Sequence, residues 1–107
     1  METKQEKIYI SLPISGYDIE ERKDTALKME IRLRGMGYDV FNPLGQQWES
    51  GLTTNEYMER DLRALLDCDG ILFMERWNHS AGCHTEFTVA VACGKQIYFE
   101  DTYMVKL

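Results

Sequence analysis

The chain has 107 residues, 44% of them hydrophobic, and carries a formal net charge of −6. This length predicts a single domain spanning residues 1–107, with enough apolar side chains to form a core. The acidic balance argues against binding a DNA or RNA polymer, which requires clustered positive charge.

Targeting signals and paired cysteines are not evident. The polar start, residues 1–7, does not resemble a signal peptide, and no apolar run approaches the roughly 20 residues of a membrane span. Three cysteines, Cys68, Cys83 and Cys93, form neither a disulfide framework nor a CxxC motif. We therefore expect a cytoplasmic protein without membrane contact.

The first third of the chain predicts a strand and a helix. Residues 7–12 are rich in β-forming side chains and end at Pro13, so a loop follows the strand. Asp18 resembles the first residue of a capping box, which opens a helix to about Arg34. The residues expected on its buried side are Ala26, Leu27, Ile31 and Leu33.

The middle of the chain repeats this order. Residues 38–41 predict a second strand, stopped by Asn42, and residues 44–53 predict a loop long enough to cover a pocket. Trp48 is its obvious apolar lid residue. A second capping-box pattern begins a helix over residues 53–66. Its expected buried stripe is Met58, Leu62, Leu65 and Leu66.

The last third predicts two more strands, residues 71–74 and 96–99, around a helix ended by Gly94. Residues 101–107 form a tail, either a short edge strand or a partner contact. Alternation of strands and helices predicts an α/β fold with a mainly parallel sheet. Right-handed crossovers favour the order 2-1-3-4, which places a ligand pocket between the first and third strands.

Glu86 is the candidate nucleophile. It follows the third strand, behind Ser80 and Gly82, and we expect it in the first turn of the last long helix. The partial positive charge of the helix N-terminus would then keep it ionised. The alternative is an acid that only complements the helix dipole.

Two aspartates are candidate partners for Glu86, because displacement of a leaving group by a carboxylate also needs an acid to protonate that group. Asp61 could reach the pocket from its helix, or be a solvated helix residue. Asp69 begins the third strand, which places it at the edge of the sheet opposite the pocket unless the chain turns there. Its alternative role is to form the turn into that strand. Tyr9 is either a core aromatic or a hydroxyl that orients a carboxylate.

Other chemistries have weaker support. His79, Cys83, His84 and Cys93 match no zinc spacing, and Cys83 as a nucleophile is a lesser rival because adjacent helix residues point in different directions. Neither a GxGxxG motif nor a P-loop is present. We therefore expect no metal and no organic cofactor.

Several motifs in order give the chain a recognisable pattern. They are Ile8-Tyr9-Ile10-Ser11-Leu12-Pro13-Ile14-Ser15-Gly16, Glu59-Arg60-Asp61-Leu62, Asp67-Cys68-Asp69-Gly70-Ile71-Leu72, and Ser80-Ala81-Gly82 followed by Glu86, Ala90 and Gly94-Lys95. Together they resemble the nucleoside 2-deoxyribosyltransferase-like family, above all its small bacterial and phage members. The resemblance implies a flavodoxin-like, Rossmann-like three-layer fold and a homo-oligomer, commonly a dimer. It also implies cleavage at the N-glycosidic bond of nucleosides or their 5′-monophosphates.

The resemblance also implies roles for individual residues. Glu86 matches the glutamate that attacks the anomeric carbon, Asp61 an acid that assists the leaving base, and Tyr9 the tyrosine that positions the nucleophile. Ser80 and Gly82 match a loop that holds the 5′ end of the sugar or its phosphate, and Asp69 matches a frequent aspartate before the third strand. The other residues expected to bind substrate are Ser11, Pro13, Ser15, Gly16 and Asn42.

The leading hypothesis is thus an enzyme that cleaves or transfers a (deoxy)nucleoside or nucleotide through a covalent glycosyl-enzyme. Pro13 and Cys83 differ from the small residues often found in relatives. They motivate a second hypothesis, a nucleotide-binding or sensing module that has lost turnover. A structural oligomer with an inert pocket is the third.

Overall fold

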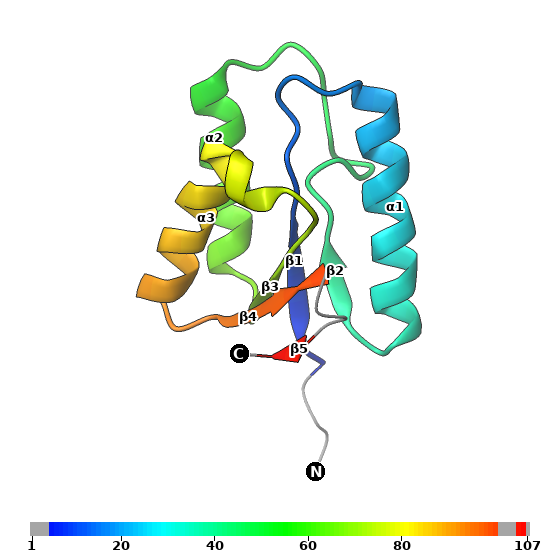
Figure 1. Cartoon of the computed structure of the whole chain (residues 1–107), viewed down its shortest axis with the longest axis vertical. Helices are drawn as coiled ribbons and strands as arrows, with labels where there is room; N and C mark the ends of the chain where they lie inside the picture. Colours follow the sequence, from blue (N-terminus) through cyan, green and yellow to red (C-terminus); the bar gives the residue numbers. More distant parts are fainter. Residues whose placement is uncertain (1–4, 101–104, 107) are drawn as a thin grey trace.

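A computed structural model describes residues 5–100 and 105–106. Its strands form one sheet in the order β2-β1-β3-β4-β5 (Figure 1). The first four pair in parallel, and β5 pairs antiparallel with β4 at the edge. The strands are β1 Lys7–Ser11, β2 Asp39–Phe41, β3 Gly70–Phe73, β4 Gln96–Phe99 and β5 Val105–Lys106.

Helices cover both faces of the sheet (Figure 1). Helix α1, Ile19–Gly35, lies on one face, and α2, Thr54–Leu66, and α3, Ala81–Ala92, lie on the other. A short 3-10 turn, Trp77–His79, connects β3 to α3. The predicted α/β class and the order 2-1-3-4 are confirmed, with β5 falling in the predicted tail.

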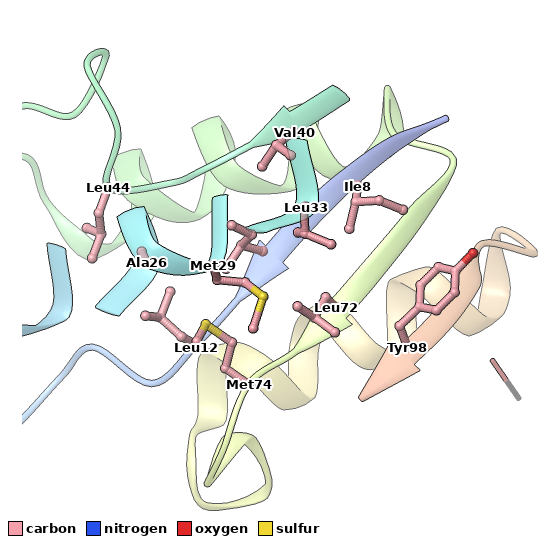
Figure 2. Close-up of a cluster of buried hydrophobic side chains, with 11 residues drawn as sticks. Ile8, Leu12, Ala26, Met29, Leu33, Val40, Leu44, Leu72, Met74 and Tyr98 are labelled. Atoms are coloured by element: carbon pink, nitrogen blue, oxygen red, sulfur yellow. The ribbon is translucent and has the colours of Figure 1, made fainter. Parts of the chain in front are cut away.

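Strand residues alternate between two apolar cores, because successive side chains point to opposite faces of a sheet. Ile8 packs with α1 in the first core (Figure 2), to which Ile10 also belongs, whereas Tyr9 belongs to the second core, under α2 and α3. All three are at most 1% exposed. The sheet therefore separates the two cores and carries Tyr9 toward the α3 side.

The buried face of α1 differs from the predicted one. Ala26, Met29 and Leu33 are buried at helical spacing, whereas Leu27 and Ile31 are 49% and 62% exposed. The three buried residues follow the i, i+3, i+7 spacing of one helix face, and Leu27 and Ile31 lie outside it. Leu66, expected in the stripe of α2, is likewise 52% exposed at the last residue of that helix.

Helix starts follow the side-chain caps in the sequence. Asp18 accepts a hydrogen bond from the backbone N–H of Glu21, and Thr53 forms a complete capping box at the start of α2. The hydroxyl of Ser80 accepts from the backbone N–H of Cys83 at 3.2 Å, so α3 begins at Ala81.

This cap corrects the expected place of Glu86. The glutamate is the sixth residue of α3 and lies in its second turn instead of its first. The electrostatic effect of a helix terminus falls off within one turn. Other causes must therefore govern the charge of Glu86.

No helix in the described part of the chain is long and apolar enough to cross a membrane.

The sheet determines where a ligand site can form, because β1 and β3 lie side by side in parallel. Their following segments therefore leave the sheet at the same edge, which is the usual place for a ligand in an open α/β sheet.

Candidate active site

A cavity of about 420 Å³ lies beyond the carboxyl ends of β1 and β3. The segment after β1 contributes Leu12, Ile14 and Ser15, and the segment after β2 contributes Leu44 and Trp48. Helix α2 supplies Tyr57, Met58, Arg60 and Asp61, and the start of α3 supplies Ser80, Gly82 and Glu86. Apolar walls with a few convergent polar groups are typical of a small-molecule site.

Two hydroxyl groups hold the carboxylate of Glu86. Tyr9 donates its phenolic O–H to Oε2 at 2.5 Å, and Ser11 donates its hydroxyl to Oε1 at 2.6 Å. Both donors come from β1, two residues apart, and therefore point to the same face of the sheet. The carboxylate is fixed at both oxygens.

Burial dominates the charge state of Glu86, which is only 8% exposed. It raises the pKa of Glu86 from 4.5 to about 7; the hydroxyls of Ser11 and Tyr9 lower the pKa, and the nearby carboxylate of Asp61 raises it. The expectation that Glu86 stays firmly ionised is therefore wrong. Its carboxyl group is instead poised to change charge near neutral pH.

Asp61 reaches the same cavity from α2. Burial raises its pKa above the ordinary value, and the guanidinium of Arg60 opposes that increase. Arg60 contacts a single oxygen of Asp61, Oδ1, from Nε at 3.0 Å and from Nη2 at 2.9 Å. The structure thus brings together two carboxyl groups, Glu86 and Asp61, at the walls of one cavity.

Five other predicted residues lie in or directly beneath the cavity. Ser15, Ser80 and Gly82 line it, as expected for substrate-binding residues. Tyr9 and Ser11 support Glu86 from below, and Ser11 contacts the carboxylate. Ser11, predicted to bind substrate, therefore lies where it orients the carboxylate of Glu86.

Pro13 and Gly16 belong to the same loop after β1 but are not among the cavity-lining residues. Pro13 is buried, and its carbonyl oxygen accepts from Arg22 at 3.4 Å. Gly16 is exposed and has φ +85°, a conformation that favours glycine in this turn. Both shape the loop that carries Ser15.

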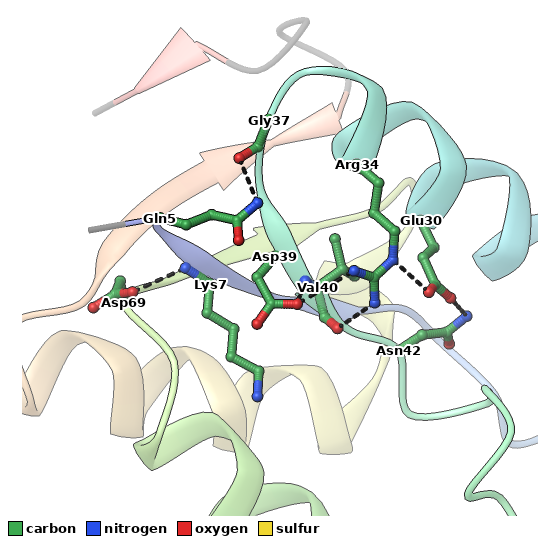
Figure 3. A network of polar contacts seen from close by, with 9 residues as sticks. All are labelled: Gln5, Lys7, Glu30, Arg34, Gly37, Asp39, Val40, Asn42 and Asp69. Carbon is green, nitrogen blue, oxygen red and sulfur yellow. Dashed lines mark hydrogen bonds and ion pairs between the residues drawn. The ribbon is translucent and has the colours of Figure 1, made fainter. Parts of the chain in front are cut away.

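The structure does not bring Asn42 or Asp69 to the cavity; both belong to polar contacts elsewhere in the fold (Figure 3). Asn42 donates its amide to Glu30 at 3.0 Å and accepts from the backbone N–H of Leu44 at 2.9 Å. Asp69 accepts from the backbone N–H of Lys7 at 2.8 Å, at the amino ends of β1 and β3. These contacts join neighbouring segments of the chain, which is a structural role.

Tyr57 and Arg60 are cavity residues that the sequence reasoning missed. With Asp61 they occupy positions i, i+3 and i+4 of α2, the spacing of one helix face. This spacing is a signal that could have identified both once Asp61 was a candidate. Trp48, the predicted lid residue, lines the cavity, with Nζ of Lys23 4.2 Å from its ring centroid.

Cysteine and metal chemistry gain no support from the geometry. Cys83 is buried, and burial raises the pKa of its thiol, which disfavours the thiolate. Nε2 of His84 lies 2.8 Å from the carbonyl oxygen of Asn78 instead of contacting Cys83. Within the described ranges, no group of three His, Cys, Asp or Glu side chains could hold a metal ion.

Two solved structures share this fold. One is a 2-deoxyribosyltransferase from the psychrotolerant bacterium Bacillus psychrosaccharolyticus, with 22% identity and a TM-score of 0.65 over 87% of this chain and 70% of that one. The other is the CMP N-glycosidase BcmB of Clostridium botulinum, with 19% identity and a TM-score of 0.61 over 87% and 69% of the two chains. No curated protein matches the chain in sequence.

The fold and site therefore define a flavodoxin-like α/β protein with a buried carboxyl group at its topological switch point. The resemblance inferred from sequence motifs is supported at the level of the fold. By sequence, the chain belongs to the DUF4406 family, described as a domain of unknown function, whose profile matches residues 6–99.

Proposed function

We propose that this protein cleaves or transfers the N-glycosidic bond of a (deoxy)nucleoside or nucleoside 5′-monophosphate, with Glu86 as nucleophile. The observation that carries the proposal is the buried carboxylate of Glu86, held by Tyr9 and Ser11 in the wall of a cavity that Asp61 shares. A fixed nucleophile and a second carboxyl group are the two parts that glycosidic chemistry requires.

In the proposed first step, an oxygen of ionised Glu86 attacks the anomeric carbon and forms an ester bond to the sugar. The bond between that carbon and the base nitrogen breaks, and its electron pair leaves with the base. Asp61 in its protonated form donates a proton to the departing base. Water or a second base then gives a proton to the ionised Asp61 and attacks the same carbon; the ester bond breaks and Glu86 is released as a carboxylate.

The cavity has an aromatic part and a polar part, which supports this substrate class. Trp48 and Tyr57 offer aromatic surface for a planar base. Ser80 and Gly82, at the start of α3, offer a hydroxyl group and a close backbone approach for the 5′ end of the sugar. The two structural neighbours act as a 2-deoxyribosyltransferase and a CMP N-glycosidase, which is consistent with this chemistry. The homo-oligomer implied by the motif resemblance is part of the proposal.

The test is an assay in which chromatography measures the free base released from a panel of nucleosides and 5′-monophosphates. Glu86→Gln removes the nucleophile and is expected to lower kcat at least about a thousandfold. Glu75→Gln is the matched control, because Glu75 also follows β3 but is exposed and does not line the cavity.

Equal activity of wild type and Glu86→Gln would remove Glu86 from the mechanism. Binding of a nucleotide by calorimetry, without released base, would instead support the non-catalytic binding module. If the protein neither binds any compound of the panel nor releases base from it, both functions are contradicted.

A further inference from the structure

Arg60 has contacts that fold stability does not explain. Its guanidinium contacts Asp61 through Nε and Nη2, and Nη2 also donates to the carbonyl oxygen of Pro43 at 2.9 Å. The remaining nitrogen, Nη1, is enclosed by protein and has no hydrogen-bond partner in the described part of the chain. A buried charged donor without an acceptor is destabilising, so the fold bears a cost in keeping this side chain.

The position of Arg60 on its helix makes the contact with Asp61 unusual. Adjacent residues on a helix do not face one another, so the arginine side chain must bend back to reach its neighbour. The carbonyl group of Pro43, in the segment after β2, fixes the guanidinium in this bent arrangement. The Cζ atom also lies 5.5 Å from the ring centroid of Tyr57 on the same helix.

The contact is also asymmetric for the carboxyl group of Asp61. Both arginine donors meet Oδ1, and no described residue donates a hydrogen bond to Oδ2. An oxygen that accepts the N–H of Nε and lies 2.9 Å from the charged Nη2 is a poor site for a proton. When Asp61 is protonated, the proton therefore belongs on Oδ2, the oxygen left available to a ligand.

We propose that Arg60 is a positioning residue that fixes Asp61 through Oδ1 and so assigns Oδ2 as the oxygen that delivers the proton to the departing base. This inference rests on the proposed function, in which Asp61 assists the leaving group. Arg60 itself does not touch the reacting atoms. It acts through Asp61 alone.

The titratable and charged groups around Asp61 determine which measurement detects its contact with Arg60. Arg60 is its neighbour on α2, Glu86 faces it from α3, and the hydroxyl of Tyr9 approaches from β1. Of these, only Arg60 lowers the pKa of Asp61. Removing the guanidinium should therefore raise the pKa of Asp61 further, because burial is then unopposed.

The decisive experiment is a double-mutant cycle on base release with Arg60→Met, Asp61→Asn and the combined variant. Arg60→Met is expected to lower kcat about 10- to 100-fold, with a smaller change in KM, because a misplaced proton donor slows the chemical step. In the Asp61→Asn background the same substitution should change kcat less than about twofold, since the two residues act as one unit. Equal losses in both backgrounds would overturn the proposal.

Arg63→Met is the matched control, because Arg63 lies on the same helix but is exposed, with Glu59 as its partner at 3.4 Å. It should leave kcat unchanged. Thermal melting checks that Arg60→Met remains folded, because the substitution removes the unpartnered Nη1 but also the donors to Asp61 and to the carbonyl oxygen of Pro43. If Arg60→Met does not fold, Arg60→Lys enters the same cycle, since one ammonium group cannot reproduce both contacts to Oδ1.

An NMR titration of the Asp61 carboxyl group separates this inference from the proposed function. The pKa of Asp61 should be higher in Arg60→Met than in wild type, whether or not any substrate turns over. An unchanged pKa would overturn the pairing of Arg60 with Asp61. Failure of the wild type to release any base would overturn the proposed function, and the titration would still decide whether Arg60 controls Asp61.

Discussion

At the scale of single residues, the site depends on opposing influences on one carboxyl group. Burial favours the neutral form of Glu86, and the hydroxyls of Tyr9 and Ser11 favour the ionised form. The result is a pKa of about 7. A carboxyl group with this pKa is about half ionised at neutral pH, so small changes in its hydrogen bonds should change its charge.

Ser11→Ala should raise the pKa of Glu86 above its wild-type value of about 7, because it removes the larger of the two hydrogen-bond effects that lower it. The acidic limb of the pH profile of kcat/KM should therefore move to higher pH, with activity lost at neutral pH and recovered in mildly alkaline buffer. Ser15→Ala is the control, because Ser15 lines the cavity but does not contact Glu86. A limb that stays in place in Ser11→Ala would contradict this account.

The sequence predicted that Glu86 and Asp61 lie near one pocket, because strand order places the segments that carry them at one edge of the sheet. The structure brings both to one cavity, and their roles stay predictions. The sequence could not predict the protonation of Glu86, because that depends on burial and on the start of α3 at Ala81. Asn42 was expected among the substrate-binding residues. Its side chain instead accepts from the backbone N–H of Leu44, a local turn typical of asparagine, and donates to Glu30, a contact that no local pattern encodes.

At the scale of elements, close packing between strands and helices determines where small residues are needed. Gly70 begins β3 in the middle of the sheet. A Cβ atom there would lie 3.1 Å from Cδ1 of Ile8 and from Cε2 of Tyr98, and 3.2 Å from the carbonyl oxygen of Gln96. Neighbours on both adjacent strands therefore crowd the position.

Gly70→Ala should lower the free energy of unfolding by about 1–3 kcal/mol, because side chains on β1 and β4 must shift to admit the methyl group. Gly35→Ala is the matched control, since no atom lies within 4 Å of its added Cβ at the end of α1. It should leave stability unchanged or raise it by up to about 1 kcal/mol. Urea unfolding curves measure both, and a neutral Gly70→Ala would show that the sheet relaxes there at no cost.

Helix and strand bounds were the most predictable features at this scale. The caps Asp18 and Thr53 identify the starts of α1 and α2, because their side chains satisfy free N–H groups of the first turn. The buried face of α1 was less predictable. Met29 is buried and Ile31 is exposed, since the orientation of the helix on the sheet, which periodicity alone does not give, decides between them.

At the scale of the whole molecule, the site reduces the stability of the fold. Glu86 has a folded-state pKa of about 7 against an ordinary value of 4.5. Between these values the folded state binds more protons than the unfolded state, so the stability contributed by Glu86 falls as pH rises. The loss is complete above about pH 7 and, at about 1.4 kcal/mol for each pKa unit, amounts to about 3 kcal/mol.

Glu86→Gln should therefore stabilise the protein relative to wild type in a pH-dependent way. The difference in unfolding free energy should be smallest below about pH 4.5 and should grow to about 3 kcal/mol above about pH 7. Denaturant unfolding at a series of pH values measures it. A difference that is independent of pH would show that ionisation of Glu86 does not lower the free energy of unfolding.

The amino ends and the carboxyl ends of the strands have different roles in the structure. At the amino ends, Asp69 ties β3 to β1 through Lys7, and Gln5 donates to the carbonyl oxygen of Gly37 (Figure 3). At the carboxyl ends, some cavity-lining side chains, such as exposed Ser15 and half-buried Trp48, take no part in this network. Leu12 and Leu44 line the same cavity but also belong to the buried core. The cavity can therefore change shape at its exposed positions while the opposite edge keeps the strands in register, whereas its core positions remain tied to the stability of the fold.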